Sequence, residues 1–208
     1  MRTDSEYAVL CAAIYNPQSK WDKIWTGNGN GIFAGVFGNT VVFRGSDCPL
    51  DWLRDFDATL YDHPELGPVH CGMMEGLDDF FAETAKLLGS SPDICGHSLG
   101  AAHAWLFAGL LARAGNNPSR IAVFGSPRPG CQQLRDILTP ISKSSYRNGN
   151  DPVTDVPVFL PGFPYVEPCD FTQLDVPPAT HDLLHDHHIE QYVAGVEALA
   201  GEVRANAV

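Results

Sequence analysis

The sequence has few basic residues, no long hydrophobic run and no closely spaced pair of cysteines. Its 208 residues include 13 Lys and Arg against 25 Asp and Glu, which gives a formal net charge of −12. Because nucleic acids and anionic membrane surfaces attract basic proteins, this balance argues against both as partners. No stretch approaches the roughly 20 apolar residues that cross a bilayer as a helix. We therefore expect no stable membrane anchor and at most transient contact with a lipid interface.

The six cysteines are scattered and show no C-x-x-C spacing of the kind that metal knuckles and redox centres use. We expect mostly free thiols, with a disulfide between Cys48 and Cys71 as the alternative. The first six residues are polar and acidic, which is not the pattern of a secretory signal. Together these features predict a reducing compartment, and the cytoplasm is favoured.

Length and composition indicate one domain, residues 1–208. The chain is 44% hydrophobic and 18% charged, is long enough to bury its own core, and shows no internal repeat or linker. Two early strands are predicted around a Gly38-Asn39 hairpin turn. From residue 70 on, strands and helices alternate, which predicts an α/β fold with a mainly parallel sheet covered by helices on both faces.

The predicted elements follow from hydrophobic periodicity and from turn residues. The predicted strands are residues 32–37, 40–43, 93–97, 120–124 and 142–147. The predicted helices are residues 5–14, part of 49–60, and residues 73–88, 98–114, 131–138 and 185–199. Residues 148–180 hold seven of the 16 prolines and no clear periodicity, so we expect a long surface connection there.

The most informative segment is Gly-His-Ser-Leu-Gly at residues 96–100. An apolar run precedes it and a helical pattern follows it, which is the strand–turn–helix context of the G-x-S-x-G nucleophile elbow. Such a turn holds its serine in a strained conformation, and the flanking glycines let strand and helix approach closely. We therefore predict Ser98 as a nucleophile. The backbone N–H of Leu99, at the start of the helix, is a predicted oxyanion donor.

A nucleophilic serine needs a histidine base, which in turn needs a carboxylate to orient it. In α/β-hydrolases the chain order is Ser, then the acid, then His. Asp151 is the first carboxylate after the strand predicted at residues 142–147, and Asp155 is the alternative acid. Four histidines before the last helix are candidates for the base: His181, His185, His187 and His188. The same cluster leaves a metal site open as a competing interpretation.

A second oxyanion donor is expected where an early strand ends. Residues 43–46 read Phe-Arg-Gly-Ser and close the strand predicted at residues 40–43. Gly45 permits a tight turn there, and Ser46 can present both its backbone N–H and its hydroxyl. Arg44 can alternatively serve as a structural ion-pair partner.

Five segments, taken in order, resemble the class 3 lipases, a fungal-type lipase and feruloyl esterase family of the α/β-hydrolase fold. They are Phe-Arg-Gly-Ser at residues 43–46, Val-His-Cys-Gly-Met at 69–73, Gly-His-Ser-Leu-Gly-Ala-Ala at 96–102, Phe-Gly-Ser-Pro-Arg-Pro-Gly at 124–130 and Asn-Asp-Pro-Val-Thr-Asp-Val-Pro at 150–157. The chain departs from the family pattern at Ala101, where the family has Gly, and at Thr154, where it has Pro. It also departs at His188, where the family has a small residue.

The resemblance implies the roles of the site residues. It implies Ser98 as nucleophile, Asp151 as acid, and Ser46 with Leu99 as oxyanion donors. Bacterial members carry a histidine five residues before a tyrosine at the last helix. His187 and Tyr192 fit this frame, so the resemblance selects His187 as the base, with His185 and His188 as rivals.

The implied activity is that of a lipase or esterase, a serine carboxylic-ester hydrolase that forms an acyl-enzyme on a small-molecule or lipid ester and needs no cofactor or metal. The alternative is a non-catalytic relative that binds a lipid or a protein in the same pocket; a serine peptidase is disfavoured. Family lipases often carry a helical lid before the Val-His segment. Its equivalent, residues 47–68, is rich in acidic residues, so we expect a short polar lid.

Overall fold

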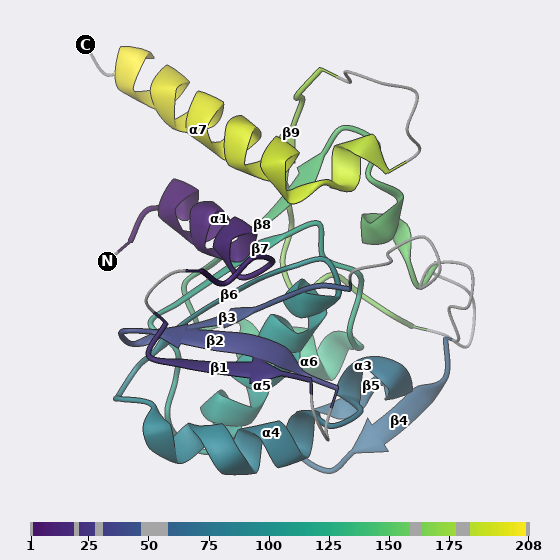
Figure 1. Cartoon of the computed structure of the whole chain (residues 1–208). Coiled ribbons are helices and arrows are strands. Elements are labelled where there is room, and N and C mark those ends of the chain that lie inside the picture. Colours follow the sequence, from purple (N-terminus) through teal and green to yellow (C-terminus); the bar gives the residue numbers. More distant parts are fainter. Residues whose placement is uncertain are drawn as a thin grey trace.

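The computed structural model describes residues 2–18, 21–27, 31–46, 58–158, 164–177 and 184–206. Within them, a seven-stranded sheet runs through the molecule in the spatial order β1-β2-β3-β6-β7-β8-β9 (Figure 1). Its strands are β1 (Lys23–Thr26), β2 (Phe33–Phe37), β3 (Thr40–Phe43), β6 (Asp93–His97), β7 (Arg120–Phe124), β8 (Lys143–Asn148) and β9 (Thr172–Leu174). Pairing is antiparallel from β1 to β3 and parallel from β3 to β9. The predicted mainly parallel sheet is confirmed.

Helices cover both faces of this sheet, also as predicted (Figure 1). On one face lie α1 (Asp4–Ala13) and α7 (Ile189–Asn206), and on the other lie α3 (Cys71–Met74), α4 (Leu77–Thr84), α5 (Leu99–Arg113) and α6 (Gln132–Leu138). Side chains of a strand alternate between the faces, so Ile94 and Cys95 belong to different hydrophobic clusters. Both residues are fully buried, as expected for a central strand of a covered parallel sheet.

The N-terminal helix is held against the end of the sheet by polar contacts. Thr3 and Glu6 form a capping box at its start. The Asp4 carboxylate accepts hydrogen bonds from Arg120 at 2.8 Å and from the Tyr146 hydroxyl at 2.6 Å. Both partners lie on strands of the sheet, so these contacts fix α1 beside β7 and β8. Tyr15, just after α1, is thereby carried toward the carboxyl end of β6.

The helix predicted at residues 73–88 is wrong in its extent. The chain instead forms α3, then α4, then a 3-10 turn, η1 (Ala85–Leu87). The break falls at Gly76, whose φ of 73° is incompatible with a continuous right-handed helix. Hydrophobic spacing alone missed this break because apolar residues continue at helical intervals on both sides of it.

Three other predictions are corrected by tertiary pairing. Leu60, the last residue of the helix and loop predicted within residues 49–60, begins β4 (Leu60–His63), which pairs with β5 (Gly67–His70) as a hairpin. Residues 47–57, which are half of the expected lid, lie outside the described residues. The connection at residues 148–180 contains a 3-10 turn, η2 (Pro152–Asp155), and the edge strand β9. The last helix begins at Ile189, after a 3-10 turn, η3 (His185–His187).

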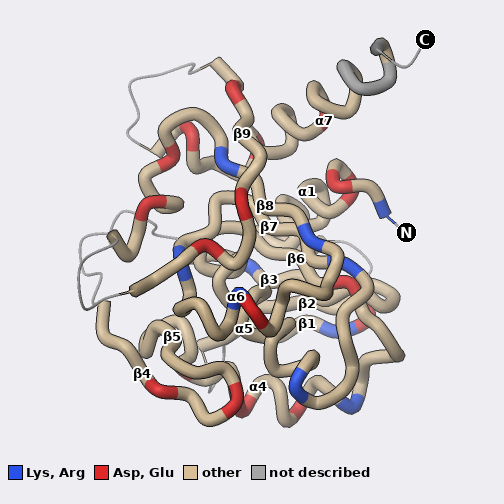
Figure 2. Tube along the Cα trace, turned by 180° about the vertical axis from the view of Figure 1, so that it is seen from behind, with Lys and Arg blue, Asp and Glu red and all other residues tan. Residues whose placement is uncertain are grey.

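The surface is acidic, in keeping with the net charge of −12. Figure 2 shows Asp and Glu positions along β4 and beside β9, with Lys and Arg positions interspersed. Among the described residues, no helix is long and apolar enough to cross a membrane.

Candidate functional site

Ser98 lies in a sharp turn between β6 and α5. Its backbone has φ 59° and ψ −132°, a region that costs free energy for a residue with a side chain. The close approach that the sequence predicts is present: a Cβ at Gly96 would collide with the backbone of Gly100, and one at Gly100 would collide with the backbone of Phe43. The predicted elbow is therefore found where the motif indicates it.

The hydroxyl of Ser98 faces His187. The distance from Ser98 Oγ to His187 Nε2 is 2.8 Å, and that from His187 Nδ1 to Asp151 Oδ2 is 2.7 Å. An ionised carboxylate only accepts hydrogen bonds, so Nδ1 carries the proton and Nε2 accepts the proton of the serine hydroxyl. This arrangement can move a proton from Ser98 to His187 and stabilise the charge that develops.

The Asp151 carboxyl is fully buried and well supplied with donors. Besides His187, it accepts hydrogen bonds from the Tyr192 hydroxyl at 2.5 Å and from the Val153 backbone N–H at 2.9 Å. Burial alone would raise the pKa of Asp151, but these donors, above all His187, outweigh it and hold the pKa below its ordinary value. The acid therefore remains ionised.

Gly125 lacks a side chain, and the hydrogen-bonded groups around Asp151 occupy the space that a side chain would take. Gly125 follows β7 and has a φ of 59°. A Cβ there would lie 2.8 Å from Asp151 Oδ2, 2.9 Å from the Tyr192 hydroxyl and 3.1 Å from His187 Nδ1. A side chain at this position would therefore push into the hydrogen-bonded group itself.

The rival residues lie elsewhere. Asp155, the alternative acid, forms a two-point ion pair with Arg147, with distances of 2.9 and 3.0 Å. His188 is exposed and lines a pocket in front of Ser98. His185 is buried in the 3-10 turn η3, which precedes His188 in the chain. Of the four candidate bases, His181 lies outside the described residues.

A second histidine, which was not among the predicted site residues, supports His187. His97 Nε2 donates to the backbone carbonyl of His187 at 2.8 Å, and its Nδ1 lies 2.8 Å from the Tyr15 hydroxyl. Burial and the nearby His187 lower the pKa of His97 to about 3, so the ring is neutral, with Nδ1 as acceptor. His97 occupies a variable position of G-x-S-x-G, and Tyr15 is 82 residues away, so only the fold brings them together.

Tyr192 is the other missed residue. Its spacing from His187 belongs to the frame that selected the base, but no contact of Tyr192 with the site was predicted. One turn into α7, its hydroxyl reaches Asp151, and burial raises the pKa of Tyr192 well above its ordinary value. The phenol therefore remains a hydrogen-bond donor to the acid.

The two predicted oxyanion donors flank the serine. Leu99 is the first residue of α5, where backbone N–H groups have no acceptor within the helix. Ser46 lines, with Ser98 and His187, a pocket of about 250 Å³, here called the Ser98 pocket. A Cβ at Gly45 would lie 2.7 Å from Ser98 Cβ, so the chain before Ser46 passes directly against Ser98.

Arg44 contacts an aromatic ring beside the site. Its guanidinium stacks over the Phe33 ring, 3.8 Å from the centroid. Ser98 itself is only 2% exposed, so the hydroxyl is reached through the Ser98 pocket rather than from an open surface.

Neither a metal site nor a disulfide is found in the part of the chain that the structure describes. Those residues hold no group of three or more His, Cys, Asp or Glu side chains that could bind a metal ion. Cys71 and the other described cysteines are free thiols, and Cys48 lies outside the described residues.

Comparison with protein families gives a match to the class 3 lipases over residues 40–160. The chain belongs to this family. Among its curated relatives, the secreted mono- and diacylglycerol lipase A of Penicillium cyclopium is 31% identical over 62% of this chain and 46% of the relative. The phospholipase A1-IIgamma of Arabidopsis thaliana is 26% identical over 80% of this chain and 50% of the relative. The matches thus span about half the length of these relatives.

Solved structures agree on the fold of this family member. Lipase II from Rhizopus niveus has a TM-score of 0.68 and 21% identity, covering 83% of this chain and 79% of that one. The native Rhizomucor miehei lipase propeptide complex has a TM-score of 0.66 and 21% identity, covering 83% and 67%. The predicted α/β-hydrolase fold is confirmed.

The predicted cytoplasmic location is contradicted. The Penicillium relatives, from Penicillium cyclopium and Penicillium camembertii, are named as secreted proteins. The scattered cysteines and the polar first residues did not justify a cytoplasmic location. Secreted proteins of this size can fold on a hydrophobic core without a disulfide framework.

Proposed function

We propose that this chain is a serine carboxylic-ester hydrolase, with Ser98 as nucleophile, His187 as general base and Asp151 as the acid that orients it. The observation that supports the proposal is one series of hydrogen bonds. It runs from Ser98 Oγ through both ring nitrogens of His187 to Asp151 Oδ2, over 2.8 and 2.7 Å. Such a series activates an otherwise weak hydroxyl nucleophile.

In the proposed reaction, His187 Nε2 takes the Ser98 proton while Oγ attacks the ester carbonyl. The carbonyl oxygen becomes negative, and the backbone N–H groups of Ser46 and Leu99 donate to it. His187 then gives the proton to the departing alcohol. Water enters, loses a proton to His187 and attacks the acyl-enzyme, which releases the acid and restores Ser98.

We propose lipid esters as the substrate class. The relatives reported above are named as an acylglycerol lipase and a phospholipase A1, and the Ser98 pocket is partly lined by the apolar side chain of Ile189. An apolar side chain beside Ser98 can contact the acyl chain of such an ester.

A fluorophosphonate probe and a short-chain p-nitrophenyl ester test this proposal together. We expect the probe to label Ser98, as located by peptide mapping, and the ester to be hydrolysed. Ser98→Ala should abolish labelling and lower turnover by about 10⁴-fold or more. Ser91→Ala is the matched control, because Ser91 also has a positive φ (50°) but is exposed at the opposite end of β6.

Three results would contradict the proposal. Absence of both labelling and hydrolysis in the folded protein would leave a non-catalytic binding protein. Faster cleavage of matched amides than of esters would favour a peptidase. Equal effects of Ser98→Ala and Ser91→Ala would remove Ser98 from its role.

A further inference from the structure

A series of hydrogen bonds leads from Tyr15 through His97 to the backbone of His187, and its direction can be assigned. His97 Nε2 lies 2.8 Å from the carbonyl oxygen of His187. A carbonyl only accepts hydrogen bonds, so Nε2 carries a proton. Burial lowers the pKa of His97 to about 3, so the ring is neutral and Nδ1 has no proton. The Tyr15 hydroxyl, 2.8 Å from Nδ1, is therefore the donor.

His97 also contacts the ring of the proposed base. The two imidazole rings have 4.8 Å between their centroids and 30° between their planes. The turn that carries His187 is η3, which is only three residues long, so its position depends on contacts with neighbouring elements. Through one hydrogen bond and one ring contact, His97 restrains both the main chain and the side chain of His187.

Tyr15 lies where the parts of the site meet. A Cβ added at Gly45 would lie 2.5 Å from the Tyr15 hydroxyl, so this hydroxyl lies directly against the turn that leads to Ser46. The ring of Tyr15 helps to line the Ser98 pocket. The segment that follows α1 therefore contacts both the turn before Ser46 and the strand that ends in His97.

The distance between Ser98 and His187 is the quantity that these contacts control. Ser98 Oγ and His187 Nε2 are 2.8 Å apart. Proton transfer is efficient at hydrogen-bond distance, and a displacement of about 1 Å can lower the rate about 10²-fold. Ser98 directly follows His97 in the chain. A hydrogen bond from His97 to His187 thus joins the turn that carries the base to the strand that carries the nucleophile.

We propose that Tyr15 and His97 are positioning residues for the reaction of Ser98. Tyr15 fixes which nitrogen of His97 carries the proton, and His97 holds the backbone and ring of His187 at hydrogen-bond distance from Ser98. Without the Tyr15 hydroxyl, the His97 ring loses one of the two contacts that fix its tautomer and orientation. The inference rests on the proposed ester hydrolase function and adds to it a role for the segment after α1.

The test measures kcat and KM for a short-chain p-nitrophenyl ester in Tyr15→Phe, in His97→Leu and in the double variant. Rates are expressed per site titrated to completion with a fluorophosphonate, so that a loss of folded protein is not counted as a loss of rate. Tyr15→Phe should lower kcat about tenfold and leave KM nearly unchanged, because the ring that lines the pocket is kept. His97→Leu should lower kcat by up to about 10²-fold. The double variant should be no slower than His97→Leu, because Tyr15 acts through His97.

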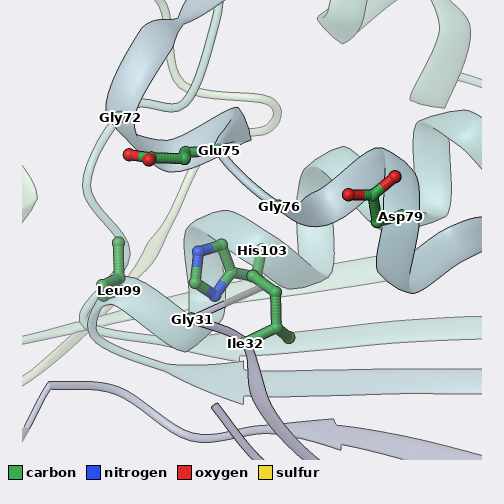
Figure 3. A pocket seen from close by; sticks show the side chains of 8 residues that line it. All are labelled: Gly31, Ile32, Gly72, Glu75, Gly76, Asp79, Leu99 and His103. Atoms are coloured by element: carbon green, nitrogen blue, oxygen red, sulfur yellow. The ribbon is translucent and has the colours of Figure 1, made fainter. Parts of the chain in front are cut away.

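Each substitution has a matched control. Tyr7 is a fully buried tyrosine of α1 whose hydroxyl lies near Asp93, at the opposite end of β6 from His97, so Tyr7→Phe is the control for Tyr15→Phe. His103 is a second buried histidine, and His103→Leu is the control for His97→Leu. Figure 3 shows His103 beside Leu99 at a cavity of about 500 Å³, which shares no lining residue with the Ser98 pocket. Both controls should keep kcat close to that of the wild type.

A conservative change separates the hydrogen bond from the packing of the ring. His97→Gln keeps an amide donor for the His187 carbonyl, so it should retain more of kcat than His97→Leu. An amide has no tautomer to fix, so Tyr15→Phe should cause no further loss in the His97→Gln background. This pair of variants also carries the test if His97→Leu does not fold.

A kcat in Tyr15→Phe equal to that of the wild type overturns the inference. Losses that multiply in the double variant overturn it as well, because Tyr15 would then act independently of His97. The proposed function fails in a different way: the wild type neither hydrolyses the ester nor reacts with the fluorophosphonate. A wild type that does both, with a kcat that does not depend on Tyr15, refutes only the positioning role.

Discussion

Two buried histidines, His97 and His103, lie on either side of Ser98 in the sequence and differ in their hydrogen bonding. His97 has both ring nitrogens engaged, one with Tyr15 and one with the backbone of His187. The Nδ1 of His103 has no partner among the described residues. Both rings are kept neutral by burial, with the pKa lowered to about 3 in His97 and to about 4 in His103.

This difference separates two uses of the same side chain. Around Ser98 the fold supplies a partner for each nitrogen of His97 and His187, so the rings are held in one orientation before substrate arrives. Such preorganisation is what proton transfer and oxyanion stabilisation require. At His103 burial alone keeps the ring neutral, because no described residue provides a hydrogen-bond partner for Nδ1.

The largest expected effect tests the fully partnered side of this comparison. Asp151→Asn should lower kcat on a short-chain ester by about 10⁴-fold, because an amide no longer holds His187 in the tautomer that accepts the serine proton. The measurement is steady-state hydrolysis at saturating ester. Asp155→Asn is the matched control, since Asp155 lies in the same loop but pairs with Arg147. A comparable loss in both variants would place the acid elsewhere.

The next prediction compares how much the protein loses in stability when each of the two histidines is replaced. His97→Leu should lower the free energy of unfolding by about 2–4 kcal/mol, because it removes the hydrogen bonds of His97 with the His187 carbonyl and the Tyr15 hydroxyl. His103→Leu should change it by no more than about 1 kcal/mol, because no protein hydrogen bond to Nδ1 is lost. Urea unfolding measures both. Equal destabilisation would show that His103 is as fully engaged as His97.

The smallest effect concerns pH. The pKa of His103 is about 4 in the folded chain and about 6.5 in an unfolded one, so below pH 6.5 the unfolded state binds more protons. The stability of the wild type should therefore fall as pH decreases from 6.5 toward 4. His103→Leu should reduce that slope by up to about 1.4 kcal/mol per pH unit. Unfolding curves between pH 6.5 and 4.5 measure the slope, and identical slopes would contradict the buried, neutral state of His103.

Much of the site could be predicted because its parts carry local signals. The elbow needs two glycines around one serine at fixed spacing, and Asp151 is the first carboxylate after the strand predicted at residues 142–147. The base was narrowed to four histidines by chain order, and to His187 only by the resemblance. Residue types alone do not separate His185, His187 and His188, because their roles depend on how a 3-10 turn faces the end of the sheet.

The errors occurred where distant segments decide the structure. The strand β9 has little sequence signal, and it forms because residues 172–174 find a free edge beside β8. His97 occupies a variable position of the motif, so no role was predicted for it. Its contact with Tyr15 forms only because the fold places the end of α1 beside it. His103 looked like an ordinary position in an apolar helix.

By itself, the sequence determined the elbow and the alternation that produces a mainly parallel sheet, because each depends on spacing within short segments. It also gave the order of the predicted nucleophile, acid and base, because that order follows the chain order of α/β-hydrolases. Only the tertiary structure decided which histidine contacts Ser98, which tyrosine supports Asp151, and which buried ring is left with an unused nitrogen. The physical reason is that hydrogen bonds act over about 3 Å. Residues separated by dozens of positions in the sequence come within this distance only after the core has packed.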